Sequence, residues 1–135
     1  MKLTLNQAPT NANIVKAYEP GRIIVGLHTY TESLILTPDT IIKDWAPQTP
    51  HEIQTQHLEI FHGMKPEILL LGTGETQVFP HHRLLADLMD RQIPVEVMDT
   101  ATACGTYNIL FSEDRAVAAA LMMIAVPYTP ASSLP

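Results

Sequence analysis

The sequence has almost no cysteine, no long apolar run and no segment that resembles a targeting signal. Its single cysteine, Cys104, has no partner for an internal disulfide, and no CxxC pair is present to bind zinc or exchange thiols. The longest apolar stretch, residues 116–126, is far shorter than the ~20 residues that span a bilayer. The first residues lack the apolar core of a secretory signal and the arginines of a transit peptide. We therefore expect a cytoplasmic protein with neither a signal peptide nor a transmembrane segment.

Basic residues are also few. The chain has eight Lys and Arg against 14 Asp and Glu, a formal net charge of −6, and its basic residues are scattered. Proteins that bind nucleic acid neutralise phosphates with a basic stripe, so this function is disfavoured. Of the 135 residues, 46% are hydrophobic and 16% are charged, which is typical of one globular domain with a substantial core.

The second half of the sequence alternates between strand and helix patterns. The expected elements, in chain order, are strand 66–72, helix 80–92, strand 93–99, helix 100–113 and a last segment, 115–126. By composition this last segment could be helix or strand, and its short length and position between a helix and a proline-bearing tail favour a strand. The first strand is apolar throughout, as expected of a strand covered on both faces. Both helices have an apolar face, formed by Leu84, Leu85, Leu88 and Met89 in the first and by Ala103, Tyr107 and Leu110 in the second. This order, with its short connections, predicts an α/β sandwich whose central strands are parallel.

The first half is expected to add antiparallel strands, which would make the sheet mixed. The runs RIIVGL (22–27) and SLILTP (33–38), separated by the polar HTYTE, predict a hairpin. Residues 39–45 offer a further short strand. A loop and a short helix follow, with Thr49 and Glu52 spaced as in a capping box.

Polar, proline-bearing and unpatterned residues flank these elements at both ends. No internal repeat is present. We expect a flexible amino-terminal arm over residues 1–13, a single α/β domain over residues 14–126 and a Pro-rich flexible tail over residues 127–135.

The motif Gly72-Thr73-Gly74 ends the strand 66–72, where a phosphate-binding loop would lie. Backbone N–H groups of such a turn can hold an anion ahead of a helix. However, a dinucleotide fingerprint needs a third glycine where Gln77 stands, no Gly-Lys-Ser/Thr follows, and Glu75 would repel a phosphate. We expect a structural turn whose glycines allow a positive φ or the close approach of another segment. Binding of a small anionic or polar ligand is the alternative.

A second turn bears on this alternative. Asp99 and Thr100 end the next strand and begin a helix, so either residue can be its N-cap. If the two strands are adjacent, their carboxyl ends form a crevice, which is the usual ligand position in open α/β sheets. The candidate ligand-binding residues, on the loops Gly72–Glu75 and Asp99–Ala103, are Gly72, Thr73, Gly74, Glu75, Asp99 and Thr100.

The six histidines do not have the spacing of metal ligands. His51 and His57 are six residues apart rather than four, and His57 and His62 would point about 140° apart on a helix. The side chains of His81 and His82, which are adjacent, are also expected to diverge. We therefore expect solvated histidines and assign no metal site.

Cys104 lies on an apolar helix face, where a buried, inert thiol is the ordinary outcome. Gly105 beside it costs helix stability, and we expect close packing of the helix on the sheet as its compensation. No residue is assigned a catalytic role and no cofactor is implied. The sequence therefore favours a non-catalytic protein, with an enzyme or a sensor for a small anionic ligand as the alternative.

Two sequence blocks resemble a known family. They are LLLGTG (69–74) and IPVEVMDTATACGTYNILFSEDRAVAAAL (93–121). Both are similar to the family of unknown function that includes the mitochondrial complex I assembly factor three and small bacterial proteins. The resemblance covers about residues 20–126 and is most specific in residues 95–108, where an Asp-Thr, an Ala-Cys and a Thr-aromatic-Asn occur in the same order.

The resemblance implies a three-layer α/β arrangement around a central mixed sheet, and no catalytic residues. The mitochondrial member implies a scaffolding role, in which the protein binds another assembly factor and subunits of a membrane complex. Because no presequence is recognised here, we expect a bacterial cytoplasmic relative that has protein partners and is peripheral to membrane complexes at most. A homo-oligomer is left open.

Overall fold

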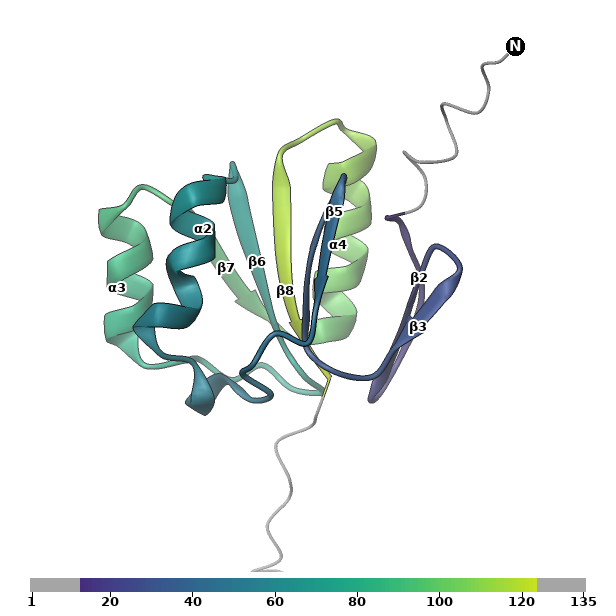
Figure 1. The fold of residues 1–135 in the computed structure, drawn as a ribbon, viewed down its shortest axis with the longest axis horizontal. Coiled ribbons are helices and arrows are strands. Elements are labelled where there is room, and N and C mark those ends of the chain that lie inside the picture. The colour runs from purple at the N-terminus through teal and green to yellow at the C-terminus, as the bar shows by residue number, and fades with distance from the viewer. Residues whose placement is uncertain (1–12, 124–135) are drawn as a thin grey trace, which may run out of the picture.

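The structure is a computed structural model, and it describes residues 13–123 (Figure 1). The predicted arm lies outside the described residues apart from Asn13, and the predicted tail lies wholly outside them. The described part contains, in chain order, β1 (Val15–Glu19), β2 (Arg22–Val25), β3 (His28–Tyr30), β4 (Leu34–Thr37), β5 (Thr40–Lys43), the 3₁₀ turns η1 (Pro50–Glu52) and η2 (Thr55–Leu58), α2 (Glu59–Met64), β6 (Ile68–Thr73), α3 (His82–Asp90), β7 (Val95–Met98), α4 (Thr100–Ser112) and β8 (Val117–Met122).

A five-stranded sheet forms the centre of the molecule, in the order β5-β4-β8-β6-β7. Strand β6 pairs in parallel with β7 on one side and with β8 on the other. Strand β4 pairs antiparallel with both β8 and β5. The mixed sheet with a parallel centre is therefore confirmed. Strand β8 is buried along its whole length and β6 along nearly all of it, which accounts for their continuous apolar sequences.

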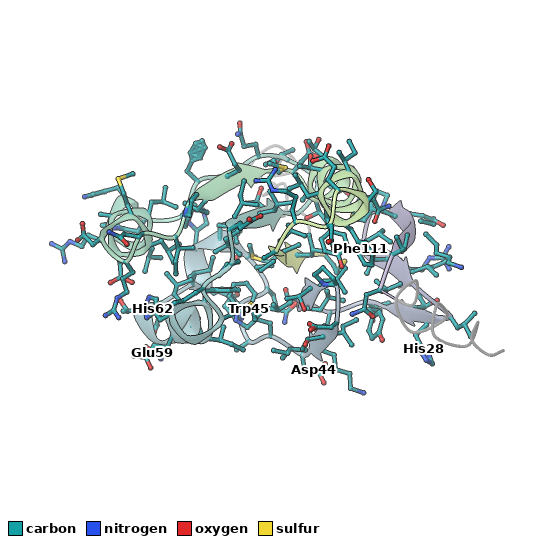
Figure 2. All side chains as sticks on the ribbon, turned by 90° about the horizontal axis from the view of Figure 1, so that it is seen from above. His28, Asp44, Trp45, Glu59, His62 and Phe111 are labelled. Carbon is teal, nitrogen blue, oxygen red and sulfur yellow. The ribbon has the colours of Figure 1, made fainter. Side chains whose placement is uncertain are left out.

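The central sheet separates two hydrophobic cores and is covered on both faces (Figures 1 and 2). On one face, Tyr107 of α4 packs with Leu70 of the sheet, and the small sheet β1-β2-β3 joins this core. On the other face, Phe61 of α2 and Leu88 of α3 pack with Leu69. Successive residues of β6 thus enter opposite cores, as the pleat of a strand requires. The predicted three-layer α/β sandwich is confirmed.

The predicted hairpin between residues 22–27 and 33–38 is wrong. The connecting residues form their own strand, β3, which pairs antiparallel with β2 across the turn Gly26-Leu27. Thr29 and Tyr30 favour a strand, and Gly26 adopts φ 60° in the tight turn. Strand β4, which is buried at every position, joins the central sheet and forms a hairpin with β5.

The predicted capping box is also wrong. The side chain of Thr49 makes no capping hydrogen bond. Glu52 Oε1 accepts a hydrogen bond from the backbone N–H of Gln48 at 2.9 Å, rather than from that of Thr49. A reciprocal capping box forms one turn later, between Gln54 and His57. The capping box therefore begins at Gln54, five residues after the predicted Thr49.

The stripe predicted for the first helix is narrower than expected. Leu84 and Leu88 are buried, whereas Leu85 is half-buried and Met89 is 72% exposed. Helix α3 packs against β7 at the edge of the sheet, so that only one side of the helix is covered.

Candidate functional site

The candidate loops lie side by side at the carboxyl ends of β6 and β7. These strands are adjacent and parallel, with Gly72 opposite Met98. The backbone N–H of Thr100 donates to the carbonyl of Gly74 at 2.8 Å, which joins the two loops directly. The chain leaves β6 for α3 on one face and leaves β7 for α4 on the other, so this edge is a topological switch point. The predicted juxtaposition is confirmed.

The hydroxyl of Thr100 ties three strand ends together. It donates to the carbonyl of Met122 at 2.7 Å and accepts from the backbone N–H of Gly74 at 2.8 Å. Thr100 is completely buried, so both partners are satisfied away from water. The N–H of Gly74 is therefore already used inside the protein.

The two glycines of the loop serve different purposes. Gly72 has no room for a side chain, because an added Cβ would lie 3.0 Å from Leu121 Cδ2, 3.0 Å from Thr100 Oγ1 and 3.1 Å from Ala103 Cβ. Gly74 adopts φ 99°, a conformation that L residues with a side chain rarely adopt. Close approach and positive φ, the two structural reasons predicted for these glycines, are both confirmed.

Thr73 organises the rest of the loop. Its hydroxyl donates to the carbonyl of Thr76 at 2.6 Å and accepts from the backbone N–H of Val78 at 3.0 Å. Thr73 is completely buried. Gln77, which stands where a dinucleotide loop has its third glycine, donates its side-chain amide to the carbonyl of Val97 on β7 at 2.9 Å. The loop is thus bonded to the strand beside it.

Asp99 is the N-cap of α4. Its Oδ1 accepts from the backbone N–H of Thr102 at 2.7 Å, and its Oδ2 accepts from the Thr102 hydroxyl at 3.0 Å. Glu75 is exposed beside it. Two carboxylates therefore stand at the end of the helix that would attract an anion.

A tyrosine that the sequence did not point to reaches the same edge. The hydroxyl of Tyr18, on β1, is buried and has no hydrogen-bond partner among residues 13–123. Burial, followed by the proximity of Cys104, Glu75 and Asp99, raises its pKa. Tyr18 lies far from these loops in sequence, and only the packing of β1 against α4 brings it to them.

The thiol of Cys104 is buried and free, as predicted. Burial, and to a smaller extent the charge of Asp99, raises its pKa to about 12. A thiol that stays protonated at neutral pH is a poor nucleophile. Its neighbour Gly105, in contrast, is exposed, and an added Cβ would meet no atom within 4 Å. The close packing predicted for Gly105 is wrong, because Gly72 of the facing strand provides it.

The histidines occupy scattered positions. Among residues 13–123, no three His, Cys, Asp or Glu side chains are placed to hold a metal ion. His62 Nε2 lies 3.2 Å from Asp87 Oδ2 and links α2 to α3. His81 and His82 do not diverge as predicted, because His81 is an extended N-cap residue rather than part of the helix, and the two rings stack at 4.4 Å.

Comparison with known proteins identifies the family. Residues 15–122 match the family described as a protein of unknown function (DUF498/DUF598). The chain belongs to this family. The resemblance noted in the sequence is thereby confirmed.

The chain is similar to both eukaryotic and bacterial proteins. The chain is 34% identical over 111 residues to the zebrafish (Danio rerio) NADH dehydrogenase [ubiquinone] 1 alpha subcomplex assembly factor 3. The matched residues make up 81% of this chain but only 63% of the zebrafish protein. It is 32% identical to a 13 kDa major membrane protein of Francisella tularensis, over 85% of this chain and 95% of that protein. The crystal structure of a Bordetella parapertussis protein matches with a TM-score of 0.77 and 35% identity, over 84% of this chain and 98% of that one. Within the described residues, this chain has no helix long and apolar enough to cross a bilayer.

Proposed function

We propose that the protein is a non-catalytic module that binds other proteins during assembly of a larger complex. The observation that carries the proposal is the 34% identity to an assembly factor of NADH dehydrogenase over 81% of the chain. The family model spans residues 15–122, which contain every described helix and strand, so the whole described framework is available to carry a binding surface.

The geometry at the carboxyl edge of the sheet supports this proposal over catalysis. The loop amide of Gly74 and the hydroxyls of Thr73 and Thr100 are engaged inside the protein. The thiol of Cys104 has a pKa of about 12, far above the range of an activated nucleophile. These amide and hydroxyl groups therefore hold the strand ends together, and the thiol stays protonated at neutral pH.

The proposed setting is the bacterial cytoplasm, with the protein peripheral to a membrane complex at most. Affinity purification from the native host, after mild crosslinking and with membranes and soluble fractions analysed separately, tests both the function and the setting. We expect the tagged chain to recover one or more partners reproducibly, and the tag alone to recover none of them. Repeated purifications with no partner above the tag control would count heavily against the proposal.

A second candidate function, binding of a small anionic ligand at the loops Gly72–Glu75 and Asp99–Ala103, is favoured by one observation. The hydroxyl of Tyr18 is a buried donor without a partner among the described residues, and such groups are costly unless a ligand or water satisfies them. Glu75 and Asp99 oppose an anion here, which is why this candidate stands second.

Substitution of Tyr18 by Phe tests this second candidate. Removing an unpaired buried hydroxyl should leave the stability of the free protein unchanged or slightly raised. NMR titrations with phosphate, sulfate and small dicarboxylates should shift the amides of Gly74 and Thr102 in the parent protein and not in Tyr18→Phe. If none of these anions shifts those amides at millimolar concentration, the candidate is removed.

A further inference from the structure

A groove opens at the other end of the central sheet, away from the candidate loops. Its volume is about 740 Å³. Three connections form its walls: the β4–β5 turn, the segment from α2 to β6 and the segment from α4 to β8. The residues that line it are Thr37, Pro38, Asp39, Thr40, Met64, Pro66, Asp114, Arg115, Ala116 and Val117.

The lining combines apolar surface with acidic groups. Pro38, Met64, Pro66 and Val117 supply apolar contacts, and of these Pro66 and Val117 are buried while Pro38 and Met64 are half-buried. A surface of this kind, formed largely by proline, methionine and valine, suits the side chains of an incoming apolar segment.

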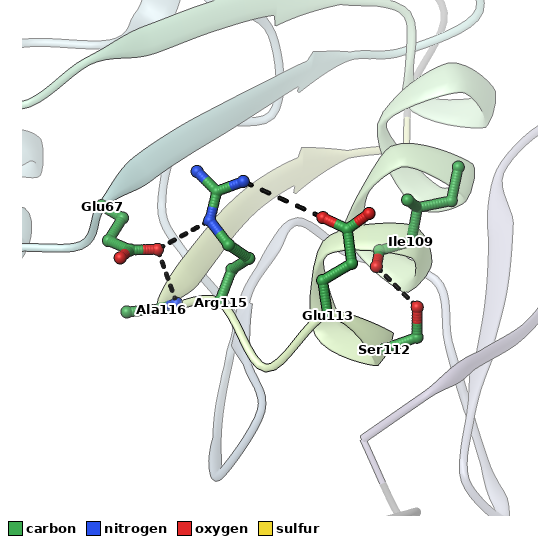
Figure 3. A network of polar contacts seen from close by, with 6 residues as sticks. All are labelled: Glu67, Ile109, Ser112, Glu113, Arg115 and Ala116. Atoms are coloured by element: carbon green, nitrogen blue, oxygen red, sulfur yellow. Dashed lines mark hydrogen bonds and ion pairs between the residues drawn. The ribbon is translucent and has the colours of Figure 1, made fainter.

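Arg115 is the one cationic side chain that the described residues contribute to the lining, and it is already neutralised. Arg115 Nε donates to Glu67 Oε1 at 2.9 Å, and its Nη1 lies 3.9 Å from Glu113 Oε1 (Figure 3). Glu67 also accepts from the backbone N–H of Ala116 at 3.2 Å, which holds the arginine against this wall. The hydrogen bonds from Arg115 and Ala116 lower the pKa of Glu67 below its ordinary value.

Two other carboxylates of the lining have no cation beside them. Asp39 Oδ1 accepts from the hydroxyls of Thr37 at 3.0 Å and Thr40 at 3.1 Å, and its second oxygen has no hydrogen-bond partner among residues 13–123. Asp114 is exposed and forms no ion pair within the described residues. With Arg115 balanced by two glutamates, the groove carries a net negative charge.

We propose that this groove binds a segment of a partner protein in which arginine or lysine alternates with apolar residues. The inference rests on the proposed protein-binding function and names the chemistry of the partner. Apolar side chains of the segment contact the exposed parts of Pro38 and Met64, and its cationic side chains pair with Asp39 and Asp114. The net charge of −6 on the whole chain adds long-range attraction for such a partner.

Two synthetic peptides test the proposal by NMR titration of the full chain. The sequence GRLPRLVRG provides the cationic and apolar side chains, and GELPELVEG keeps the apolar residues but reverses the charge. We expect the first peptide to shift amides in residues 37–40, 64–67 and 113–117, with an affinity that falls as salt is added. The second peptide should bind far more weakly.

Matched variants assign the binding to the two carboxylates. Asp39→Asn keeps the oxygen that accepts from the threonine hydroxyls, and Asp114→Asn suits the positive φ of 61° at that position. Together they should weaken binding of the cationic peptide by about fivefold, the effect of losing two exposed charge pairs. The control pair, Asp90→Asn and Glu96→Gln, removes the same amount of charge from exposed positions of α3 and β7 and should leave the affinity unchanged.

Several outcomes would overturn the proposal. Equal binding of the two peptides, equal loss of affinity in the control pair, or shifts centred outside the groove would each contradict it. The same shifts produced by spermidine with comparable affinity would identify the occupant as a small cation instead. The proposed function is tested separately, because a partner that is recovered from cells but leaves these amides unchanged would remove this groove and keep the function.

Discussion

The side-chain amide of Asn108 bonds to the backbone of Val15 as a neighbouring strand would. Asn108 Oδ1 accepts from the Val15 N–H at 3.0 Å, and Asn108 Nδ2 donates to the Val15 carbonyl at 2.8 Å. The first residue of strand β1 is thus attached to α4, 93 residues away in sequence. The hydroxyl of Tyr107 adds a third bond, to the carbonyl of Asn13 at 2.9 Å. These bonds explain how the small sheet is held beside α4.

Substitution of Asn108 by Ala should therefore loosen the small sheet. The change leaves the Val15 N–H and carbonyl without their partner, and we expect the free energy of unfolding to fall by about 1–3 kcal/mol. Urea denaturation measures the loss, and hydrogen exchange should show faster exchange at Val15. Asn108→Asp, which keeps the acceptor for the N–H but loses the donor, should fall between the parent and Asn108→Ala. An Asn108→Ala protein as stable as the parent would contradict the attachment.

Substitutions of Thr100 test whether its hydroxyl joins the strand ends at the carboxyl edge of the sheet. Thr100→Val keeps the shape of the side chain but leaves the Gly74 N–H and the Met122 carbonyl unpaired, and should cost about 1–3 kcal/mol of stability. Thr100→Ser keeps the hydroxyl and should cost less. The comparison is made by thermal and urea unfolding, and a Val variant more stable than the Ser variant would show that the hydroxyl does not join the strand ends.

Gly72, packed against α4, and Gly105, on the exposed side of α4, should respond in opposite directions to alanine. Gly72→Ala forces Leu121, Thr100 and Ala103 to move and should destabilise by about 1–3 kcal/mol, as overpacked cores do. Gly105→Ala, in open space on α4, should stabilise by about 0.5–1 kcal/mol through the higher helix propensity of alanine. Melting temperatures of both variants check the pair. A Gly72→Ala protein that kept its melting temperature but lost a partner would instead make this loop a recognition element.

Leu88 and Met89 provide an internal comparison on α3. Leu88 is 1% exposed in the core against β6, so Leu88→Ala should cost about 2–5 kcal/mol. Met89 is 72% exposed, and Met89→Ala should change stability by no more than about 0.5 kcal/mol. Denaturant titrations measure the loss of stability in each variant. Similar losses in both would mean that the helix is rotated relative to the sheet.

Strong local patterns allowed much of the fold to be predicted. Strand β6 followed from its uninterrupted apolar sequence, α3 from its apolar periodicity, and β8 from its short length and its position after a helix. Asp99 was recognised as a cap candidate because its residue type and position fit one. The pairing of β2 with β3 was not predicted, because the three polar residues 28–30 look like the loop of a hairpin rather than a strand. Gly105 was misinterpreted for a related reason: a glycine in a helix looks the same in sequence whether its face is buried or exposed.

The candidate site shows a similar division. Adjacency of the Gly72 and Asp99 loops followed from the rule that ligands and loops gather at the carboxyl ends of parallel strands. The hydroxyl of Tyr18 and the groove at the opposite end of the sheet did not follow, because each is assembled from segments far apart in the chain. Residues that only tertiary contacts bring together have no regular spacing in the sequence by which they could be recognised.

Cys104 should make the stability of the protein depend on pH above about 9. Its thiol has an ordinary pKa of 9.0 in the unfolded chain, and burial raises the pKa to about 12 in the folded protein. The unfolded state therefore releases a proton first, so this group's contribution to stability is complete below pH 9 and is lost progressively as the pH rises toward 12. Between pH 9 and 10, the free energy of unfolding of the parent should fall more steeply than that of Cys104→Ala, which keeps every tyrosine. Urea midpoints across this window measure the two slopes, and identical slopes would show that the thiol is accessible to ionisation in the folded protein.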